Sequence, residues 1–180
     1  MNEKTVKPFG LKDKIGYMFG DFGNDFTFMF SSTFLMVFYM KVLGISAGAV
    51  GTLFLVARFV DAFTDVTMGR IVDTCKPGRD GKFKRWIRIM AGPVALASFL
   101  MYQSALADAS MTVKMIYMYA TYILWGSICY TGINIPYGSM ASAITDVPEE
   151  RTALSTFRSI GATLAQLIIG VGGPMIIYVT

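Results

Sequence analysis

Three ionisable residues stand within one apolar stretch of this sequence. Arg58, Asp61 and Asp65 lie in the run 47–68, which is otherwise hydrophobic enough to cross a membrane. Because they are spaced at three and four residues, they share one face of a helix. Ionisable groups inside a membrane span are costly, which makes them candidates for function. A single arginine neutralises a single aspartate, so the other carboxylate is left to bind a cation or hold a proton.

Two interpretations of this charged face stay open. In the first, Arg58 and an aspartate form an ion pair that only locks two helices together. In the second, Asp61 and Asp65 are ligands of a cation, and the neighbouring hydroxyl of Thr64 contributes a further oxygen. Anionic oxygen ligands suit a hard cation, so the second interpretation predicts a site for Na+ or for a proton.

Polar side chains on two other apolar runs can interact with this charged face or line a cavity beside it. Tyr130, Thr131 and Asn134 share a helical face in the run 112–143. They either hydrogen-bond between helices or line a cavity. Arg158, in the last apolar run, either snorkels to the headgroups or faces the cavity and meets Asp25 or a ligand.

The run 16–40 carries two acids of different depth. Asp21 is expected near the entrance of the helix, where an acid suits the positive end of the helix dipole. Asp25 lies deeper in the run. A carboxylate facing a cavity accepts two hydroxyl hydrogens from a sugar, and the neighbouring Asn24 adds an amide.

The composition indicates an all-α membrane protein that positions these side chains on spanning helices. Of the 180 residues, 54% are hydrophobic and 16% are charged, whereas a soluble domain carries about 25% charged residues. A proline at position 136 is expected to end or kink the fourth run. The sequence predicts about five transmembrane helices, after a polar segment 1–15, over the spans 16–40, 47–68, 87–107, 112–143 and 152–180.

The cations predict the orientation in the membrane. Four lysines stand in 1–15 and seven cations in the loop 70–88, while the opposite turns carry only Lys41 and Lys114. The positive-inside rule then places the N-terminus in the cytoplasm of a multi-pass inner membrane protein. The basic loop is either a solvated anchor or a latch, in which Asp73 and Arg79 join a charge network that opens and closes.

Several other classes of protein are disfavoured. The cations lie in short loops between apolar runs and not along one groove, so no nucleic acid partner is expected. The chain has no histidine, no nucleophile elbow and no phosphate loop, so it is not predicted to be an enzyme. Cys75 and Cys129 have no metal-ligand spacing and are expected to be free thiols.

Three motifs resemble one known family of transporters. They are GYMFGDFGNDF, VARFVDAFTDVTMGRIVD followed by GKFKRW, and YILWGSICYTGINIPYGS. Together they are similar to the N-terminal half of the glycoside–pentoside–hexuronide:cation symporters, the melibiose-carrier branch of the major facilitator superfamily. The resemblance covers residues 11–180 and therefore nearly the whole chain.

The resemblance implies a role for each polar residue of the cation site. Asp61 and Asp65 match the paired aspartates that bind the coupling cation, and Thr131 matches the threonine that completes the site. Thr64 stands where the melibiose carrier has an asparagine ligand. The coupling cation is Na+ or H+, and no other cofactor is implied.

The resemblance also implies a sugar pocket. Asp25 matches the aspartate that holds sugar hydroxyls, and Tyr130 and Arg158 match pocket positions. Asn24 stands where the melibiose carrier has a lysine, and Asn134 replaces a second sugar-binding aspartate. The NIPYGS form resembles members that carry glucuronides and xylosides.

Members of this family have twelve helices in two halves, with the substrate between the halves. Five helices are therefore expected to be a truncated N-terminal half whose partner is the missing C-terminal half. The resemblance implies sodium- or proton-coupled symport of a glycoside, pentoside or hexuronide across the lipid bilayer. The alternative is a non-transporting membrane scaffold or assembly partner, which would use the same polar face to associate with other helices.

Overall fold

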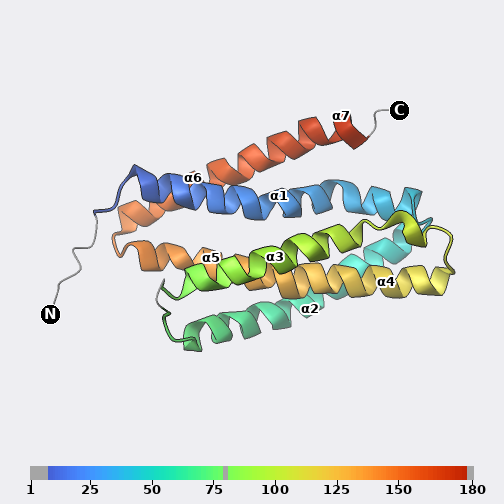
Figure 1. The fold of residues 1–180 in the computed structure, drawn as a ribbon, viewed down its shortest axis with the longest axis horizontal. Helices are drawn as coiled ribbons and strands as arrows, with labels where there is room; N and C mark the ends of the chain where they lie inside the picture. Colours follow the sequence, from blue (N-terminus) through green and yellow to red (C-terminus); the bar gives the residue numbers. More distant parts are fainter. Residues whose placement is uncertain (1–7, 79–80, 178–180) are drawn as a thin grey trace.

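Each of the five apolar runs forms one rod of helix in the computed structural model, which describes residues 8–78 and 81–177 (Figure 1). The first three rods are α1 (Leu11–Lys41), α2 (Ala47–Thr74) and α3 (Phe83–Met101), and a short 3-10 turn, η1 (Ser104–Leu106), follows α3. The fourth rod is α4 (Met111–Ile123), η2 (Leu124–Tyr130) and α5 (Thr131–Ile144), and the fifth is α6 (Pro148–Leu167), η3 (Ile168–Gly172) and α7 (Gly173–Ile177).

Local sequence signals set several of the helix ends. Asp13 accepts a hydrogen bond from the backbone N–H of Gly10 at 2.9 Å and closes the first turn of α1. The Ser46 hydroxyl accepts from the Ala49 N–H at the start of α2, as a capping serine does. Gly44 adopts a φ of 69° in the turn between these two helices, a conformation that glycine reaches without steric cost.

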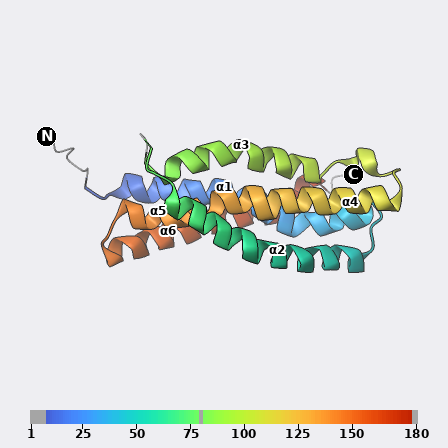
Figure 2. The ribbon, with the colours of Figure 1, turned by 90° about the horizontal axis from the view of Figure 1, so that it is seen from below.

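The rods run alternately up and down, so the loops gather at two ends. The start of α1, the α2–α3 loop and the α5–α6 loop lie together at the left of Figure 1. The fourth rod passes between α2 and α3, and α1 packs along α6 (Figure 2). The most cationic segments therefore share one end of the bundle, which is the arrangement assumed in the predicted orientation. Which side of the membrane this end faces stays a prediction.

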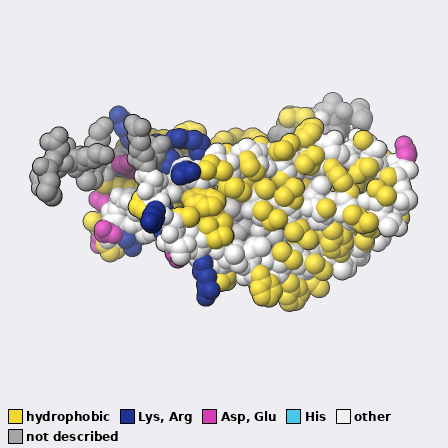
Figure 3. Space-filling model, turned by 60° about the horizontal axis from the view of Figure 1, so that its bottom comes forward, with side chains coloured by type: hydrophobic (Ala, Val, Ile, Leu, Met, Phe, Trp, Pro, Cys, Tyr) yellow, Lys and Arg dark blue, Asp and Glu magenta, His cyan; other side chains and the backbone are white. Residues whose placement is uncertain are grey.

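The interior is apolar along the middle of the rods. A continuous cluster of buried side chains joins α1, α2, α3 and the fourth rod, and it includes Leu35, Tyr39, Leu53, Met101 and Met118. Large hydrophobic side chains also cover the outside over most of the length of the bundle (Figure 3). An exterior of this kind fits a hydrocarbon environment.

Three helical segments of the described part are long and apolar enough to cross a membrane: Ala47–Thr74, Phe83–Leu106 and Pro148–Ile177. The first and fourth rods, which were also predicted to span the membrane, are not among these three segments of the described part. These findings support the predicted class, an all-α membrane protein. The exact limits of the spans within the bilayer stay a prediction.

The expectation for the proline at position 136 is partly wrong, because α5 continues through it to Ile144. The irregular segment lies before the proline, where η2 has the wider π-helical pattern from Leu124 to Tyr130. A proline removes only one helical hydrogen bond, and contacts with neighbouring helices stabilise the remainder of the helix.

Two glycines allow α1 to approach its neighbours closely. A Cβ atom at Gly161 of α6 would collide with the backbone oxygen of Met18, and one at Gly20 of α1 would lie 2.7 Å from the Tyr137 ring. Small residues at such crossings let two backbones come together. This close packing brings α6 and α5 against the polar face of α1.

Candidate functional site

Two hydroxyl–carboxylate pairs join α2 to the fourth rod. The Thr131 hydroxyl donates a hydrogen bond to Asp65 Oδ1 at 2.8 Å. The Ser127 hydroxyl donates to Asp61 Oδ1 at 2.5 Å. The two aspartates are four residues apart on α2, and the two hydroxyl residues are four apart on the fourth rod. The two pairs therefore lie one helical turn apart. Four oxygen-bearing side chains thus face each other across one helix contact.

Arg58 neutralises this cluster only weakly. Its Nη1 lies 3.6 Å from Asp61 Oδ2, and its side chain is 72% exposed. An exposed pair at this distance contributes little. Among the described residues, Asp65 has no basic partner. The cluster therefore keeps the surplus of negative charge that the sequence predicted.

Ser127 was not predicted from the sequence to be part of this cluster. Ser127 lies four residues before Thr131, and that spacing could have identified it. Between the two residues the helix is π-helical, and the Thr131 N–H bonds back to the Gly126 carbonyl. Such π-helical turns are frequent at functional sites. Here the turn presents both hydroxyls to α2.

A cavity of about 280 Å³ opens beside this cluster. Asp61, Asp65 and Thr131 line one part of it, and Tyr130 and Asn134 line another. Aromatic rings, including that of the buried Trp125, form much of the remaining wall. The cavity therefore combines charged oxygens with aromatic surface, as ligand sites commonly do.

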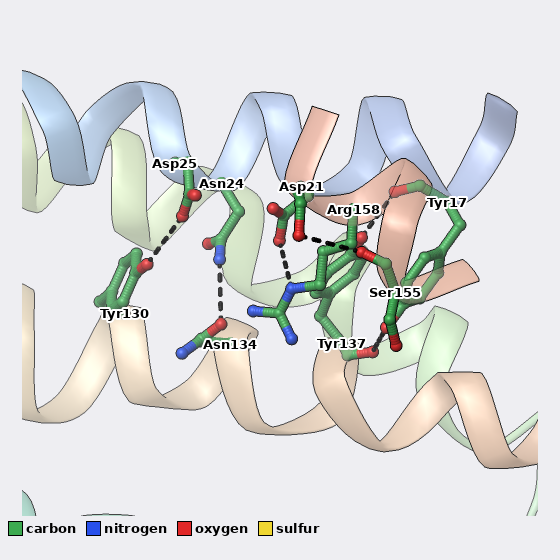
Figure 4. Close-up of polar contacts among 10 residues, drawn as sticks. Tyr17, Asp21, Asn24, Asp25, Tyr130, Asn134, Tyr137, Ser155 and Arg158 are labelled. Carbon is green, nitrogen blue, oxygen red and sulfur yellow. Dashed lines mark hydrogen bonds and ion pairs between the residues drawn. The ribbon is translucent and has the colours of Figure 1, made fainter. Parts of the chain in front are cut away.

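Two predicted polar residues of α1 contact Tyr130 and Asn134 of the fourth rod, which also line this cavity. The Tyr130 hydroxyl donates to Asp25 Oδ1 at 3.3 Å. The Asn24 amide donates to Asn134 Oδ1 at 3.2 Å. Figure 4 shows these two contacts side by side along α1. Four of the five sugar-binding residues implied by the resemblance are thus brought together, and Tyr130 and Asn134 belong both to this row and to the cavity lining. The fifth, Arg158, is not part of this row.

Asp21 has a different environment from the one expected. It lies in the third turn of α1, because the helix begins at Leu11, and its side chain is only 1% exposed. Arg158 Nε donates to Asp21 Oδ1 at 2.9 Å (Figure 4). The expectation that Asp21 sits at the helix entrance is therefore wrong. Arg158 does turn inward to meet an acid, but that acid is Asp21 and not the predicted Asp25. Arg158 also does not line the cavity beside the cation cluster.

Aromatic rings hold this ion pair in place. The Arg158 guanidinium carbon lies 5.3 Å from the centre of the Tyr137 ring. Tyr137 stacks on Tyr17 with ring centres 4.7 Å apart, and its hydroxyl donates to the Tyr17 carbonyl at 2.6 Å. A cation above an aromatic face gains further stabilisation. The pair therefore ties α1, α5 and α6 together.

Comparison with known proteins identifies the family. The sequence model of the MFS/sugar transport proteins matches residues 16–180. The chain belongs to this family. The match and the relatives described next confirm the resemblance to the glycoside–pentoside–hexuronide symporters. Membership of a family of transport proteins also agrees with the prediction that the chain is not an enzyme.

Three relatives show how far the similarity extends. The glucuronide carrier protein homolog of Escherichia coli (strain K12) is 41% identical over 150 residues, which are 83% of this chain and 32% of that protein. The inner membrane symporter YicJ of the same strain is 39% identical over 158 residues, 88% of this chain and 34% of that protein. The isoprimeverose transporter of Lactiplantibacillus pentosus is 38% identical over 167 residues, 92% of this chain and 34% of that protein. The chain thus spans about a third of the length of these transporters.

Of three other predicted residues, Thr64 and Asp73 do not line the cavity, and Arg79 is not described. The Thr64 hydroxyl donates to the carbonyls of Val60 and Asp61 on its own helix and does not line the cavity. The Asp73 carbonyl accepts a hydrogen bond from Lys82 at 2.8 Å. Arg79 lies outside the described residues. The predicted roles of these residues stay predictions.

The donor set of the cluster fits a hard cation. In 8–78 and 81–177 there is no group of three or more His, Cys, Asp or Glu side chains that could hold a metal. Asp61 and Asp65 with the hydroxyls of Ser127 and Thr131 instead offer four side chains with two kinds of oxygen donor, carboxylate and hydroxyl. Oxygen donors of this type suit Na+ and can equally share a proton.

Proposed function

We propose that this chain forms part of a sodium- or proton-coupled symporter of a glycoside, pentoside or hexuronide. The observation that carries the proposal is the pair of hydroxyl–carboxylate contacts beside the cavity, Ser127 with Asp61 and Thr131 with Asp65. The cation binds between α2 and the fourth rod. Its charge neutralises the carboxylates that the exposed Arg58 leaves unbalanced.

The sugar is proposed to bind along α1. Asp25 and Asn134 offer oxygen acceptors for hydroxyl groups, and Tyr130 offers an aromatic face and a hydroxyl. The buried Asn24 Oδ1 has no hydrogen-bond partner within the described part of the chain. A buried acceptor without a partner is costly, and a sugar hydroxyl would satisfy it. The names of two relatives, a glucuronide carrier protein homolog and an isoprimeverose transporter, support a sugar of this class.

Tyr130 and Asn134 connect the proposed cation site to the proposed sugar site. Both side chains line the cavity that contains Asp61 and Asp65, and both contact the polar row of α1. A cation that tightens the contact between α2 and the fourth rod therefore also fixes two sugar-binding side chains. Such coupling is reciprocal, so the sugar strengthens cation binding by the same factor.

Transport requires more than this bundle. In the proposed mechanism a second half, supplied by a C-terminal partner, closes over the cavity, and rocking of the two halves exposes the ligands to each side in turn. The protein lies in the inner membrane with its N-terminus in the cytoplasm, surrounded by lipid. The inner membrane symporter among the relatives supports this location.

Thermal unfolding of the purified chain tests the cation site. Sodium chloride is compared with choline chloride at equal ionic strength, and the comparison is repeated over a series of pH values. We expect the melting temperature to rise with Na+ or with protonation, because a ligand that binds only the folded state stabilises it. A scaffold that uses the polar face for helix association predicts a stable oligomer and no response to either ion.

Replacing Ser127 with alanine is expected to weaken the cation response without abolishing it. The variant removes one hydroxyl from Asp61 and leaves both carboxylates in place. The loss of one such contact is expected to lower the apparent cation affinity by roughly three- to tenfold, measured in the same titration. Ser142→Ala, which removes an exposed hydroxyl on α5, is the matched control. An unchanged affinity in Ser127→Ala would exclude this residue from the site.

A further inference from the structure

A second cavity lies at the end of the bundle away from the cation cluster. It has a volume of about 370 Å³ and opens between the end of α2 and the start of α3. Lys76, Lys82 and Arg85 contribute three cationic side chains to its lining, and Trp86 and Ile89 contribute an apolar wall. No acidic residue lines it among those that the structure describes.

The cavity stands where two membrane-crossing segments leave the apolar region. Ala47–Thr74 and Phe83–Leu106 are both long and apolar enough to span a bilayer, and the cavity is formed by residues at their adjoining ends. On the face shown in Figure 3, lysine and arginine side chains gather at this end together with several acidic ones, and hydrophobic side chains are frequent over the rest of that face. Tryptophan is favoured at the interface between lipid and water. Cations and a tryptophan at the ends of two apolar segments are the combination expected at the depth of lipid headgroups.

Local contacts give the cationic rim a defined shape. Lys82 Nζ donates to the Asp73 carbonyl at 2.8 Å and lies 5.8 Å from the centre of the Phe83 ring. Gly81 turns the loop with a φ of 88°. Lys82 is thereby fixed at one side of the cavity.

The other two cations remain available to a ligand. Within the described residues, neither Lys76 nor Arg85 forms an ion pair. Both are exposed, and both line the cavity. Three cations without an acidic neighbour on the lining favour an anion with several acceptor oxygens.

We propose that this cavity binds an anionic phospholipid. The phosphate of the headgroup contacts Lys76, Lys82 and Arg85, and the adjoining acyl chain lies against Ile89, whose side chain is 52% exposed. Inorganic phosphate shares the headgroup chemistry, but it leaves the apolar wall uncovered. Phosphatidylglycerol satisfies both parts of the cavity, and each basic residue near such a lipid strengthens its binding.

Lipid binding to the purified 180-residue chain tests the proposal. Phosphatidylglycerol and phosphatidylcholine with the same acyl chains, and inorganic phosphate alone, are titrated in turn, and bound lipid is counted by native mass spectrometry. The cavity variant is Lys76→Gln with Arg85→Gln, which spares the hydrogen bond of Lys82. The matched control, Arg70→Gln with Lys84→Gln, removes two exposed cations nearby that do not line the cavity.

The parent chain is expected to bind phosphatidylglycerol at least tenfold more tightly than phosphatidylcholine. The cavity variant is expected to lose roughly 10- to 30-fold in phosphatidylglycerol affinity, and the control less than about threefold. The double variant Arg85→Lys with Lys76→Arg keeps both charges and should keep its affinity for phosphatidylglycerol. If it loses as much affinity as the glutamine variant, the proposal is overturned. An equal loss in the control variant would overturn it as well. Displacement of the lipid by inorganic phosphate at equal concentration would instead assign the cavity to a free anion and overturn it too.

Discussion

Replacement of Asp65 by asparagine is expected to lower the apparent cation affinity of the chain at least tenfold. The asparagine keeps the shape of the side chain but removes one of the two charges that face Ser127 and Thr131. Affinity for a hard cation depends strongly on the number of charged ligands, and the exposed Arg58 would then balance the one charge that remains. The measurement is the shift of the melting temperature with Na+ or with pH.

Asp108→Asn serves as the matched control, because it removes an exposed carboxylate from the turn after α3 and leaves the cavity unchanged. That variant should respond to the cations as the parent does. If Asp65→Asn and Asp108→Asn respond equally, Asp65 is not a ligand, and the contact with Thr131 only joins two helices.

The second large effect is expected at Arg158. Its replacement by glutamine leaves the carboxylate of Asp21 buried without a cation, since only 1% of that side chain is exposed. Removal of one partner of such a pair costs about 3 kcal/mol. Asp21→Asn is expected to cost only about 1 kcal/mol, because Arg158 is 38% exposed and can remain hydrated. The measurement is the free energy of unfolding in detergent micelles.

Two further measurements test this explanation: a double variant of the inner ion pair, and a variant of an ion pair on the surface. Asp21→Asn combined with Arg158→Gln is expected to be more stable than Arg158→Gln alone, because no single charge remains buried. Arg151→Gln breaks the pair with the fully exposed Asp146 and should change the stability by less than about 1 kcal/mol. A loss for Arg158→Gln no larger than that for Arg151→Gln would show that the inner pair does not hold the bundle together.

The rods and the cation cluster could be predicted from the sequence because both depend on local spacing. Apolar runs determine spanning helices, and offsets of three and four residues determine which side chains share a face. Asp61 and Asp65 were found in this way, and Thr131 was placed beside them through the resemblance to the family. The row of Asn24 and Asp25 against Tyr130 and Asn134 likewise appears in the structure.

The partner of Arg158 could not be predicted in the same way. Spacing fixes the face of one helix, but not how that helix is rotated against its neighbours. Asp21 was assigned to a helix entrance because the apolar run begins near position 16, whereas α1 begins at Leu11. The close contact at Gly161 then turns α6 so that its arginine reaches this acid. Such a contact depends on tertiary packing.

The π-helical segment is a second feature that local patterns did not indicate. Proline at 136 pointed to a break within α5, whereas the irregular hydrogen bonds lie at Leu124–Tyr130. A wider turn changes which side chains face α2, and Ser127 in this segment lies beside Asp61. Neither residue composition nor helical periodicity signals such a turn.

Sugar uptake by a transporter that joins this chain to a C-terminal half tests the central claim most directly. Uptake of a radiolabelled glucuronide and of a xyloside is measured in vesicles, with and without an inward gradient of Na+ or of protons, for the parent and for Asp65→Asn. The proposal predicts that one of these gradients drives accumulation by the parent, and that Asp65→Asn loses this dependence while Asp108→Asn retains it. Accumulation by Asp65→Asn that follows the gradient as strongly as the parent would contradict the assignment of the cation site.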